Sequence, residues 1–329
     1  MIISRAPVRI SLGGGGTDLA SYYSQFGGFL VAAAINKYVY IAANKTFDDN
    51  ICLKYSKTEI VRNTESIKHR IFKAAFQMTG IKYGIEMASI ADIPANCGLG
   101  SSSAFTVALL NALHAYKKEY VSLEQLAEEA CKIEIEILGE PIGKQDQYIA
   151  TFGGLTCLTF DKNGRVTVEP LKIPPAAIHD LENKIMLFYT RIERSASDIL
   201  ADQNEAVQKG KSKTVDNLHK IKEIGLETKK AFEDGNLDRF GELLNLHWET
   251  KKKLSDKITD PFIDRAYQAA LRKGALGGKL IGAGGGGFLL FYCPKDRASL
   301  IEEMKKLGLA WTPFHFEPEG AKIIANLPN

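Results

Sequence analysis

Glycine is distributed unevenly along this chain of 329 residues, and that distribution constrains the fold more than any other feature. Of the 29 glycines, four form the run Gly13–Gly16, two are Gly98 and Gly100, and seven lie between Gly277 and Gly287. Glycine clusters let the backbone approach a ligand closely and adopt positive φ. One cluster is often only a turn. Three clusters spread over the chain predict one composite site built from distant segments.

The second cluster lies within Pro94–Ala104, where a glycine turn leads into Ser101–Ser103 and an apolar helix. The N-terminus of a helix presents free N–H groups and the positive end of the dipole, which together bind anions. Glycines remove side chains that would block a phosphate, and serine hydroxyls bind phosphate oxygens or Mg²⁺. The segment therefore predicts a phosphate loop, although a plain serine-capped helix start has the same composition. A Walker A pattern is absent from the chain.

The third cluster, Gly282–Gly287, fits the pattern GxGxxG. A dinucleotide-binding fingerprint must follow a strand and open a helix. Here the glycines lead into the apolar run Phe288–Tyr292, which predicts a strand. The cluster therefore indicates a turn packed against another loop or a substrate, and not a nicotinamide site.

Charged residues near these clusters are candidates for the chemistry. The polar segment Gly139–Gln147 is predicted as a loop, and its Asp146 is either a base or charge anchor or simply a solvated carboxylate. Glu134 and Glu136 precede it on a predicted helix, where only one of the two points inward, because residues i and i+2 do not share a face. Arg9, on the first strand, either faces the site or forms an ion pair at a sheet edge.

Apolar periodicity and turn signals predict two α+β domains, 1–173 and 174–329, that meet at the Pro174–Pro175 pair. Ser122 begins a capping box, and the segment 161–164 predicts a hairpin turn. Strands are expected at 2–12, 29–43, 84–90, 155–160, 166–171, 184–189, 288–293, 313–316 and 321–325. Helices are expected at 67–79, 101–116, 122–138 and 298–307, with a helical block over 195–272.

Composition excludes several classes of protein. A net charge of +3 gives no electrostatic case for binding nucleic acid or a membrane surface. Five scattered cysteines without CxxC spacing argue against a disulfide framework or a zinc site. The first residues show no signal peptide, and the uncharged run 95–116 is too polar for a membrane span, so a cytoplasmic protein is expected. Nothing in the sequence indicates the oligomeric state.

Three motifs together resemble the GHMP kinase family of small-molecule kinases, which includes galactokinase and the homoserine, mevalonate and phosphomevalonate kinases. They occur in the family order as Arg5–Leu12, Pro94–Ala104 and Ile281–Phe288. The resemblance covers nearly the whole chain. It implies an α+β fold of two domains, an N-terminal domain like ribosomal protein S5 and a C-terminal ferredoxin-like domain.

The same resemblance implies roles for individual residues. Asp146 matches the catalytic aspartate, and Arg9 matches the arginine that faces the reacting hydroxyl. Ser102 and Glu134 match the residues that bind Mg²⁺. The ATP phosphates are expected to contact Pro94, Gly98, Leu99, Gly100, Ser101, Ser102 and Ser103.

The acceptor site is expected to carry the specificity. Within the family the chain looks most like the kinases of D-glycero-D-manno-heptose 7-phosphate. Galactokinases carry Gly-Glu-His where this chain has Gly14–Gly16, and the loss of two side chains predicts room for a longer or phosphorylated sugar. The expected acceptor-binding residues are Gly14, Gly15, Gly16, Thr17, Asp18, Arg194, Gly285 and Gly286.

The predicted reaction is transfer of the ATP γ-phosphoryl group to the anomeric hydroxyl of that heptose phosphate, which gives the 1,7-bisphosphate. The expected cofactors are ATP and Mg²⁺, and the expected partner is a small sugar phosphate. Two alternatives stay open. The acceptor is L-fucose or another sugar, or the chain is a catalytically silent ATP- and sugar-binding regulator.

Overall fold

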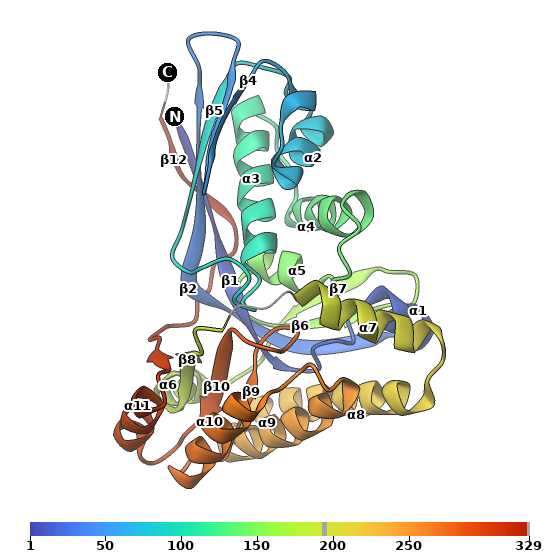
Figure 1. Cartoon of the computed structure of the whole chain (residues 1–329), viewed down its shortest axis with the longest axis vertical. Coiled ribbons are helices and arrows are strands. Elements are labelled where there is room, and N and C mark those ends of the chain that lie inside the picture. Colours follow the sequence, from blue (N-terminus) through green and yellow to red (C-terminus); the bar gives the residue numbers. More distant parts are fainter. Residues whose placement is uncertain (193–195, 328–329) are drawn as a thin grey trace.

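A computed structural model describes residues 1–192 and 196–327 of the chain. Two β-sheets form its two halves, one above the other in Figure 1, with helices packed around each. The predicted two-domain α+β fold is confirmed. Within the described residues no helix is both long and apolar enough to cross a membrane.

The larger sheet has eight strands and is built around β1 (Ile2–Gly13) and the long β2 (Gly28–Lys45), which pair antiparallel. Its path runs β12-β1-β2-β5-β3-β4, and the hairpin β6–β7 joins the far part of β2. The remaining strands are β3 (Ile51–Lys54), β4 (Thr58–Val61), β5 (Ile85–Ala91), β6 (Leu155–Phe160), β7 (Val166–Pro170) and β12 (Lys322–Asn326).

The apolar run of strand β2 is continuous because both faces of the strand are buried against other parts of the protein. Successive side chains of a strand point to opposite faces. Phe29, Val31, Ala33 and Ile35 join the main core. Leu30, Ala32 and Ala34 join a second cluster, formed with the helices α4 (Leu123–Cys131) and α5 (Gln145–Phe152). The strand predicted over 29–43 is therefore present and buried on both sides.

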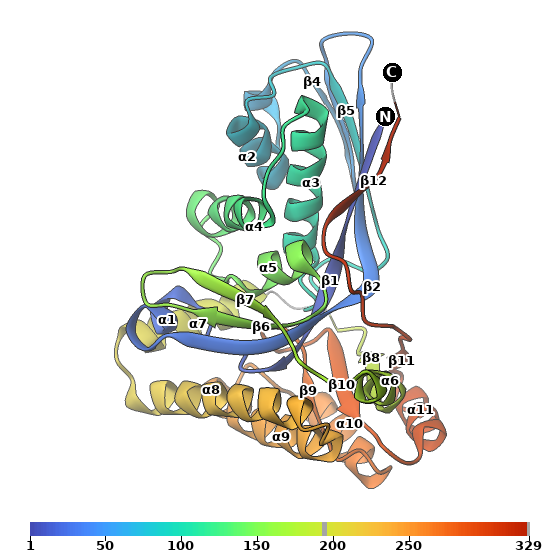
Figure 2. The same ribbon diagram turned by 180° about the vertical axis from the view of Figure 1, so that it is seen from behind.

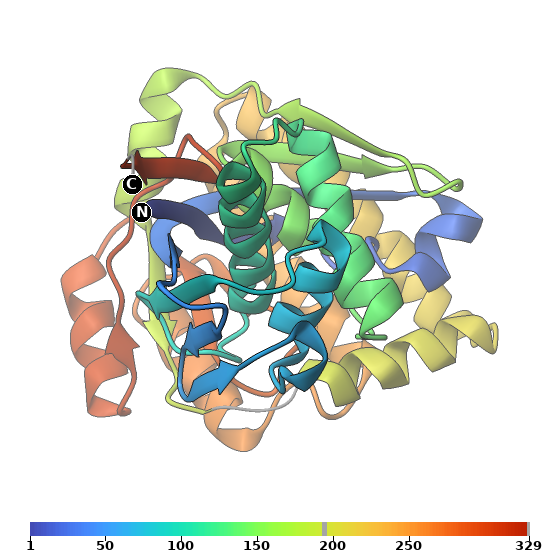
Figure 3. The same cartoon turned by 90° about the horizontal axis from the view of Figure 1, so that it is seen from above.

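Four helices of the first half, α2 to α5, lie on one side of the larger sheet, with α3 nearest to it (Figures 1 and 3). Helix α3 begins directly after the predicted phosphate loop and is buried on nearly every face, as its sequence predicts. The helices of this half are α1 (Ala20–Phe26), α2 (Arg70–Thr79), α3 (Ser101–Lys117), α4 (Leu123–Cys131) and α5 (Gln145–Phe152), with the short turns η1 (Thr64–Ser66) and η2 (Lys132–Ile137).

The smaller sheet has four antiparallel strands in the order β11-β8-β10-β9. Numbered along the chain this is 4-1-3-2, the strand order of a ferredoxin-like domain. Its strands are β8 (Ile185–Tyr189), β9 (Gly277–Leu280), β10 (Phe288–Tyr292) and β11 (Ala310–Trp311). Its helices are α6 (Pro175–Lys184), α7 (Ala196–Gln208), α8 (Ser212–Glu233), α9 (Leu237–Lys251), α10 (Pro261–Arg272) and α11 (Arg297–Lys306), with the turn η3 (Lys252–Leu254).

Three local predictions were wrong. The end of the predicted loop 139–147 is the first turn of helix α5, and the predicted proline linker opens helix α6 with Pro175 at its N-terminal turn. The predicted strand at 313–316 is reduced to one bridge between Phe316 and Ile35, while the paired strand forms at β11. The helix predicted over 122–138 is present, and its last part is the π-helical turn η2.

The end of the chain returns to the first half. Strand β12 pairs antiparallel with β1, so the two ends of the chain lie side by side at the far end of the larger sheet (Figure 2). The division into 1–173 and 174–329 stays a prediction, and strand β12 ties the second segment to the first.

Candidate active site

The second and third glycine clusters contact each other between the two sheets. A Cβ atom placed on Gly98 would lie 2.7 Å from the carbonyl oxygen of Ile281, and one on Gly282 would lie 2.7 Å from the Cα of Gly98. A Cβ on Gly287 would lie 2.2 Å from the carbonyl oxygen of Cys97. Because these distances leave no room for a side chain, glycine is what lets the two loops approach each other.

The first glycine run has two structural functions. Gly13 and Gly14 provide the surface on which α8 packs, since a Cβ on Gly13 would lie 2.8 Å from Oγ1 of Thr228. Gly15 leaves space for the hydroxyl of Ser11, which would lie 2.6 Å from a Cβ at that position. Only the second half of the run therefore opens toward the site.

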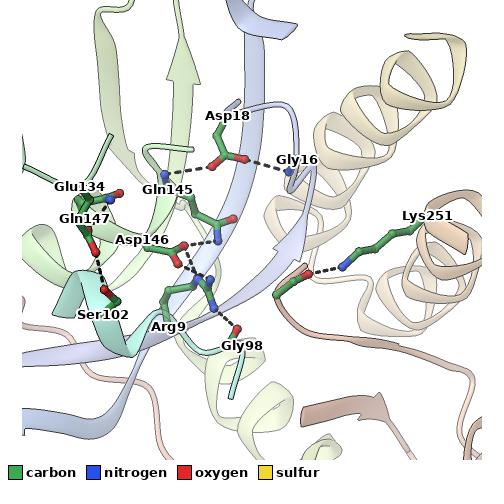
Figure 4. Close-up of polar contacts among 11 residues, drawn as sticks. Arg9, Gly16, Asp18, Gly98, Ser102, Glu134, Gln145, Asp146, Gln147 and Lys251 are labelled. Carbon is green, nitrogen blue, oxygen red and sulfur yellow. Dashed lines mark hydrogen bonds and ion pairs between the residues drawn. The ribbon is translucent and has the colours of Figure 1, made fainter. Parts of the chain in front are cut away.

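Arg9 connects the first strand to the phosphate loop and to Asp146 (Figure 4). From β1 its Nε donates to Oδ1 of Asp146 at 2.7 Å and its Nη2 donates to Oδ2 at 2.6 Å. Its Nη1 donates to the carbonyl oxygen of Gly98 at 2.6 Å. The arginine side chain is 6% exposed and the aspartate side chain 23%. The bidentate pair holds the carboxylate in one orientation while leaving part of it open.

Glu134 is buried beside the phosphate loop. Its Oε1 accepts a hydrogen bond from Oγ of Ser102 and its Oε2 accepts one from Nε2 of Gln147, both at 2.7 Å. Burial raises the pKa of Glu134 to about 6, against an ordinary value of 4.5. Glu136 is exposed, so the expectation that only one of these two glutamates points inward is confirmed.

Asp18 lies on the other side of Asp146. Its two carboxylate oxygens accept backbone hydrogen bonds from Gly16, at 3.0 Å, and from Gln145, at 3.2 Å. Burial and the nearby charge of Asp146 raise the pKa of Asp18. A Cβ on Gly143 would lie 2.0 Å from Oδ2 of Asp18, so the absence of a side chain at position 143 leaves room for the Asp18 carboxylate.

Two cavities meet at the Arg9–Asp146 pair. The first, of about 690 Å³, runs along the phosphate loop and is lined by Asn96, Gly98, Gly100, Ser101, Ser102, Ser103 and Glu134. The second is lined by Ser11, Gly15, Gly16, Asp18, Gly143, Gln145, Gln203, His247, Lys251 and Lys279. Both linings include Arg9 and Asp146 as well as Gly282 and Ala283. We call the first the phosphate-loop cavity and the second the inner cavity.

A larger cavity, of about 1430 Å³, lies away from this chemistry, against the β6–β7 hairpin. Its lining contains neither Arg9 nor Asp146 and no residue of the phosphate loop. Cavity size alone therefore does not lead to the Arg9–Asp146 pair, which lies where the two smaller cavities meet.

The second half of the chain contributes cations to the inner cavity that sequence reasoning missed. Lys251 and His247 lie on α9, and Lys279 lies on β9. Burial, with Arg9 nearby, lowers the pKa of Lys251 to about 7. Burial also holds the pKa values of Lys279 and His247 well below their usual ranges. The sequence did contain one signal for this group of cations: Lys279 is the one charged residue in the apolar run before the third glycine cluster.

Several expected site residues lie behind the cavities rather than in their linings. Thr17 is fully buried and donates to the carbonyl oxygens of Gly14 and Phe29. Leu99 is a core residue whose carbonyl oxygen accepts from the Arg9 amide. Pro94, Gly285 and Gly286 are not among the described residues that line either cavity. Arg194 lies outside the described residues.

Comparisons with known proteins agree with the motifs. The model of the GHMP kinases N-terminal domain matches residues 65–154, and that of the GHMP kinases C-terminal domain matches 228–308. The D-glycero-alpha-D-manno-heptose 7-phosphate kinase of Campylobacter jejuni is 31% identical over 98% of both chains. The L-fucokinase/L-fucose-1-P guanylyltransferase of Bacteroides fragilis is 28% identical over 91% of this chain and 35% of its own length.

Solved structures place the fold in the same group. A D-glycero-D-manno-heptose 1-phosphate kinase from Bacteroides thetaiotaomicron superimposes with a TM-score of 0.83 at 26% identity, over the whole of both chains. Kinases of this family use ATP. The two family domains, the identity over almost the full length and the shared architecture lead to one conclusion: the chain belongs to the GHMP kinase family and is an ATP-dependent sugar kinase.

Proposed function

We propose that this kinase transfers the γ-phosphoryl group of ATP to the anomeric hydroxyl of D-glycero-D-manno-heptose 7-phosphate. The observation that carries the proposal is the position of the Arg9–Asp146 pair, where the phosphate-loop cavity meets the inner cavity. A triphosphate on the phosphate loop and a sugar in the inner cavity would present their reacting groups to each other at this pair. Phosphoryl transfer depends mainly on such positioning and on neutralisation of charge.

Asp146 orients the acceptor hydroxyl in this mechanism. A carboxylate offers about four lone-pair directions. Arg9 occupies two of them and Nε2 of Gln145 a third, at 3.1 Å from Oδ1. The remaining direction accepts a hydrogen bond from the acceptor hydroxyl, and the Arg9 guanidinium offsets the negative charge that develops on that oxygen as its proton shifts to the carboxylate. An anomeric hydroxyl is more acidic than an ordinary alcohol, so this paired carboxylate suffices.

Ser102 and Glu134 would hold the Mg²⁺ that accompanies ATP. The fit rests on their chemistry, because both offer oxygen ligands beside the phosphate loop and Mg²⁺ uses one or two carboxylates plus phosphate oxygens. Glu134 is buried without a cationic partner among the described residues, which disfavours its ionised form. Mg²⁺ held there would supply positive charge that offsets the triphosphate.

Replacing Glu134 by glutamine is expected to raise the Mg²⁺ concentration that gives half-maximal rate by roughly tenfold or more. Glutamine keeps the shape and the hydrogen bond from Ser102 but removes the charge. Steady-state rates measured across Mg²⁺ concentrations at fixed ATP give the effect. Glu136→Gln, on the exposed face of the same turn, is the matched control. An equal Mg²⁺ requirement in the parent and in Glu134→Gln would contradict the assignment.

The acceptor assignment rests on the similar proteins and on the inner cavity. The Campylobacter relative acts, by its name, on a heptose 7-phosphate, and the Bacteroides structure is named for a heptose 1-phosphate. On the first-half wall of the cavity, Ser11 Oγ and Gln145 Oε1 are buried without a hydrogen-bond partner in the structure. Such groups, with Asp18 and Asp146, suit the hydroxyls of a sugar. We place the enzyme in the cytoplasm, as expected for an ATP-dependent kinase whose five cysteines are free.

A Mg-ATP phosphotransfer assay on a panel of acceptors tests the proposal. The panel contains D-glycero-D-manno-heptose 7-phosphate, the 1-phosphate, unphosphorylated heptose, mannose, L-fucose and galactose. We expect kcat/KM to be highest for the 7-phosphate and phosphorus NMR to show a new anomeric phosphate. Preference for L-fucose, the substrate named for the Bacteroides fragilis relative, would keep the mechanism and replace the acceptor. Activity on no acceptor would favour a silent binding protein.

A further inference from the structure

We propose that Lys251, Lys279 and His247 form the binding site for the phosphate monoester that the sugar acceptor already carries. This inference rests on the proposed function, which supplies a phosphorylated acceptor but no residues of the described chain to bind its phosphate. The three side chains converge on the inner cavity from the second half of the molecule. Figure 4 shows Lys251 extending from its helix toward the site, with its ammonium hydrogen-bonded to a backbone carbonyl oxygen, that of Gly282.

The local sequence brings these groups together. His247 and Lys251 are four residues apart on α9 and therefore share one face of the helix. Strand β9 approaches that helix closely, since a Cβ on Gly277 would lie 2.1 Å from the carbonyl oxygen of Gly241. This approach places Nζ of Lys279 3.2 Å from Nδ1 of His247. The arrangement is a built cluster, not a chance meeting of flexible surface lysines.

The two lysines of the cluster have no carboxylate partner among the described residues. Lys251 donates to the carbonyl oxygens of Leu280, at 3.3 Å, and Gly282. Lys279 is 2% exposed and donates to the histidine. Within residues 1–192 and 196–327, no ion pair joins either ammonium to a carboxylate. Because a buried ammonium without a counter-charge is unfavourable, a bound anion would stabilise the charged form of both lysines.

Two hydrogen-bond donors in the same cavity also lack acceptors. When Lys279 is an ammonium it can only donate, so His247 accepts at Nδ1 and carries its proton on Nε2, which is buried and has no partner in the described structure. Nε2 of Gln203 is likewise buried without a partner. Unsatisfied buried donors are uncommon and indicate a ligand that supplies acceptor oxygens. A phosphate group supplies three.

The position of the cluster separates it from the ATP phosphates. Lys251, Lys279 and His247 line the inner cavity and are not among the described residues that line the phosphate-loop cavity. Acceptor groups, namely Ser11, Asp18, Gln145 and Asp146, occupy the first-half wall of the same cavity. The inner cavity therefore has acceptor groups on one side and donor groups on the other, which corresponds in polarity to the hydroxyl and phosphate groups of a sugar phosphate.

Binding should also change protonation. Lys251 faces Arg9, Lys279 and the imidazole of His247 as well as the carboxylates Asp146 and Asp18 across the cavity, and its pKa is lowered to about 7. At pH 8 it is therefore mainly neutral before the ligand binds. A dianion favours the charged form, so binding at pH 8 takes up protons, whereas at pH 6 the lysine is already charged.

The test compares Lys279→Met and Lys251→Met with the parent, and uses Lys252→Met as the control. Lys252 follows Lys251 but pairs with Glu249 at 2.8 Å, so its loss removes one charge outside the cluster. For each protein, kcat/KM is measured for heptose 7-phosphate and for unphosphorylated heptose. Methionine removes a buried charge, and thermal unfolding checks that each variant folds. If one cluster variant does not fold, the other carries the test.

We expect the ratio of the two kcat/KM values to fall about 100-fold in each cluster variant, which corresponds to roughly 2.7 kcal/mol of discrimination. In Lys252→Met the ratio should stay within about twofold of the parent value. Calorimetric titration with inorganic phosphate, in the presence of a non-hydrolysable ATP analogue, should show at least tenfold weaker binding. Titration at pH 8 in buffers of different ionisation enthalpy should show proton uptake in the parent and less in Lys251→Met.

The outcomes separate this inference from the proposed function. If the parent prefers the 7-phosphate and the cluster variants keep that preference, the inference is wrong and the proposed acceptor stands. If the parent shows no preference for the phosphorylated sugar, both the acceptor and the cluster's role are wrong. Loss of preference in the cluster variants alone supports both.

Discussion

Replacing Asp146 by asparagine is expected to lower kcat at least about 100-fold, or roughly 2.7 kcal/mol of transition-state stabilisation, with little change in the affinity for ATP. The carboxylate is held by two hydrogen bonds from Arg9 and faces the inner cavity, so it meets the acceptor and not the adenosine end of ATP. Asparagine keeps the shape but removes the charge and one acceptor oxygen. Single-turnover rates with acceptor and ATP both saturating measure the chemical step.

Two comparisons make this result specific. Asp256→Asn changes an exposed aspartate and controls for the chemical substitution itself. Arg9→Met, alone and with Asp146→Asn, shows whether the pair acts as a unit. We expect the double variant to be only slightly slower than either single variant, because groups that act together lose their effect together. A loss below tenfold in Asp146→Asn would count against a central role.

The sequence predicted most of the fold because its strongest signals are local. The alternation of glycine turns with apolar runs predicted β1, β2, β6, β7, β8 and β10 within a few residues, and the uniform apolarity of 101–116 predicted the buried α3. Helix α5 was missed because Gly139–Gln147 is polar and glycine-rich up to its first turn. Its stability comes from packing against α4 and β2, which no local pattern records.

The candidate site was predicted unevenly for a related reason. Arg9, Ser102, Glu134 and Asp146 were named because they belong to motifs with recognisable spacing, and the structure brings all four together. The cluster of Lys251, Lys279 and His247 has no such spacing, since 28 positions separate its two lysines along the chain. Their meeting depends on β9 packing against α9, which is a tertiary event.

The contact between the two glycine loops gives the second large expected effect. Gly282→Ala would place a Cβ 2.7 Å from the Cα of Gly98 and 2.8 Å from its carbonyl oxygen, so backbone must move. The phosphate loop has no free side on which to move, because Arg9 also holds the carbonyl oxygen of Gly98. We expect kcat/KM for ATP to fall about 100-fold, since the displaced N–H groups and serines no longer face the triphosphate together.

Gly274→Ala separates this steric effect from ordinary backbone strain. Gly282 and Gly274 both have left-handed backbone, with φ values of 82° and 92°, but a Cβ on Gly274 meets nothing within 4 Å. Each substitution should therefore lose roughly 1–2 kcal/mol of stability from its conformation, and only Gly282→Ala should lose ATP turnover as well. Gly98→Ala, whose Cβ would lie 2.7 Å from Ile281, should repeat that loss from the other loop. If ATP kinetics in Gly282→Ala matched those in Gly274→Ala, the glycines would serve folding alone, and the close contact between the loops would have no part in holding ATP.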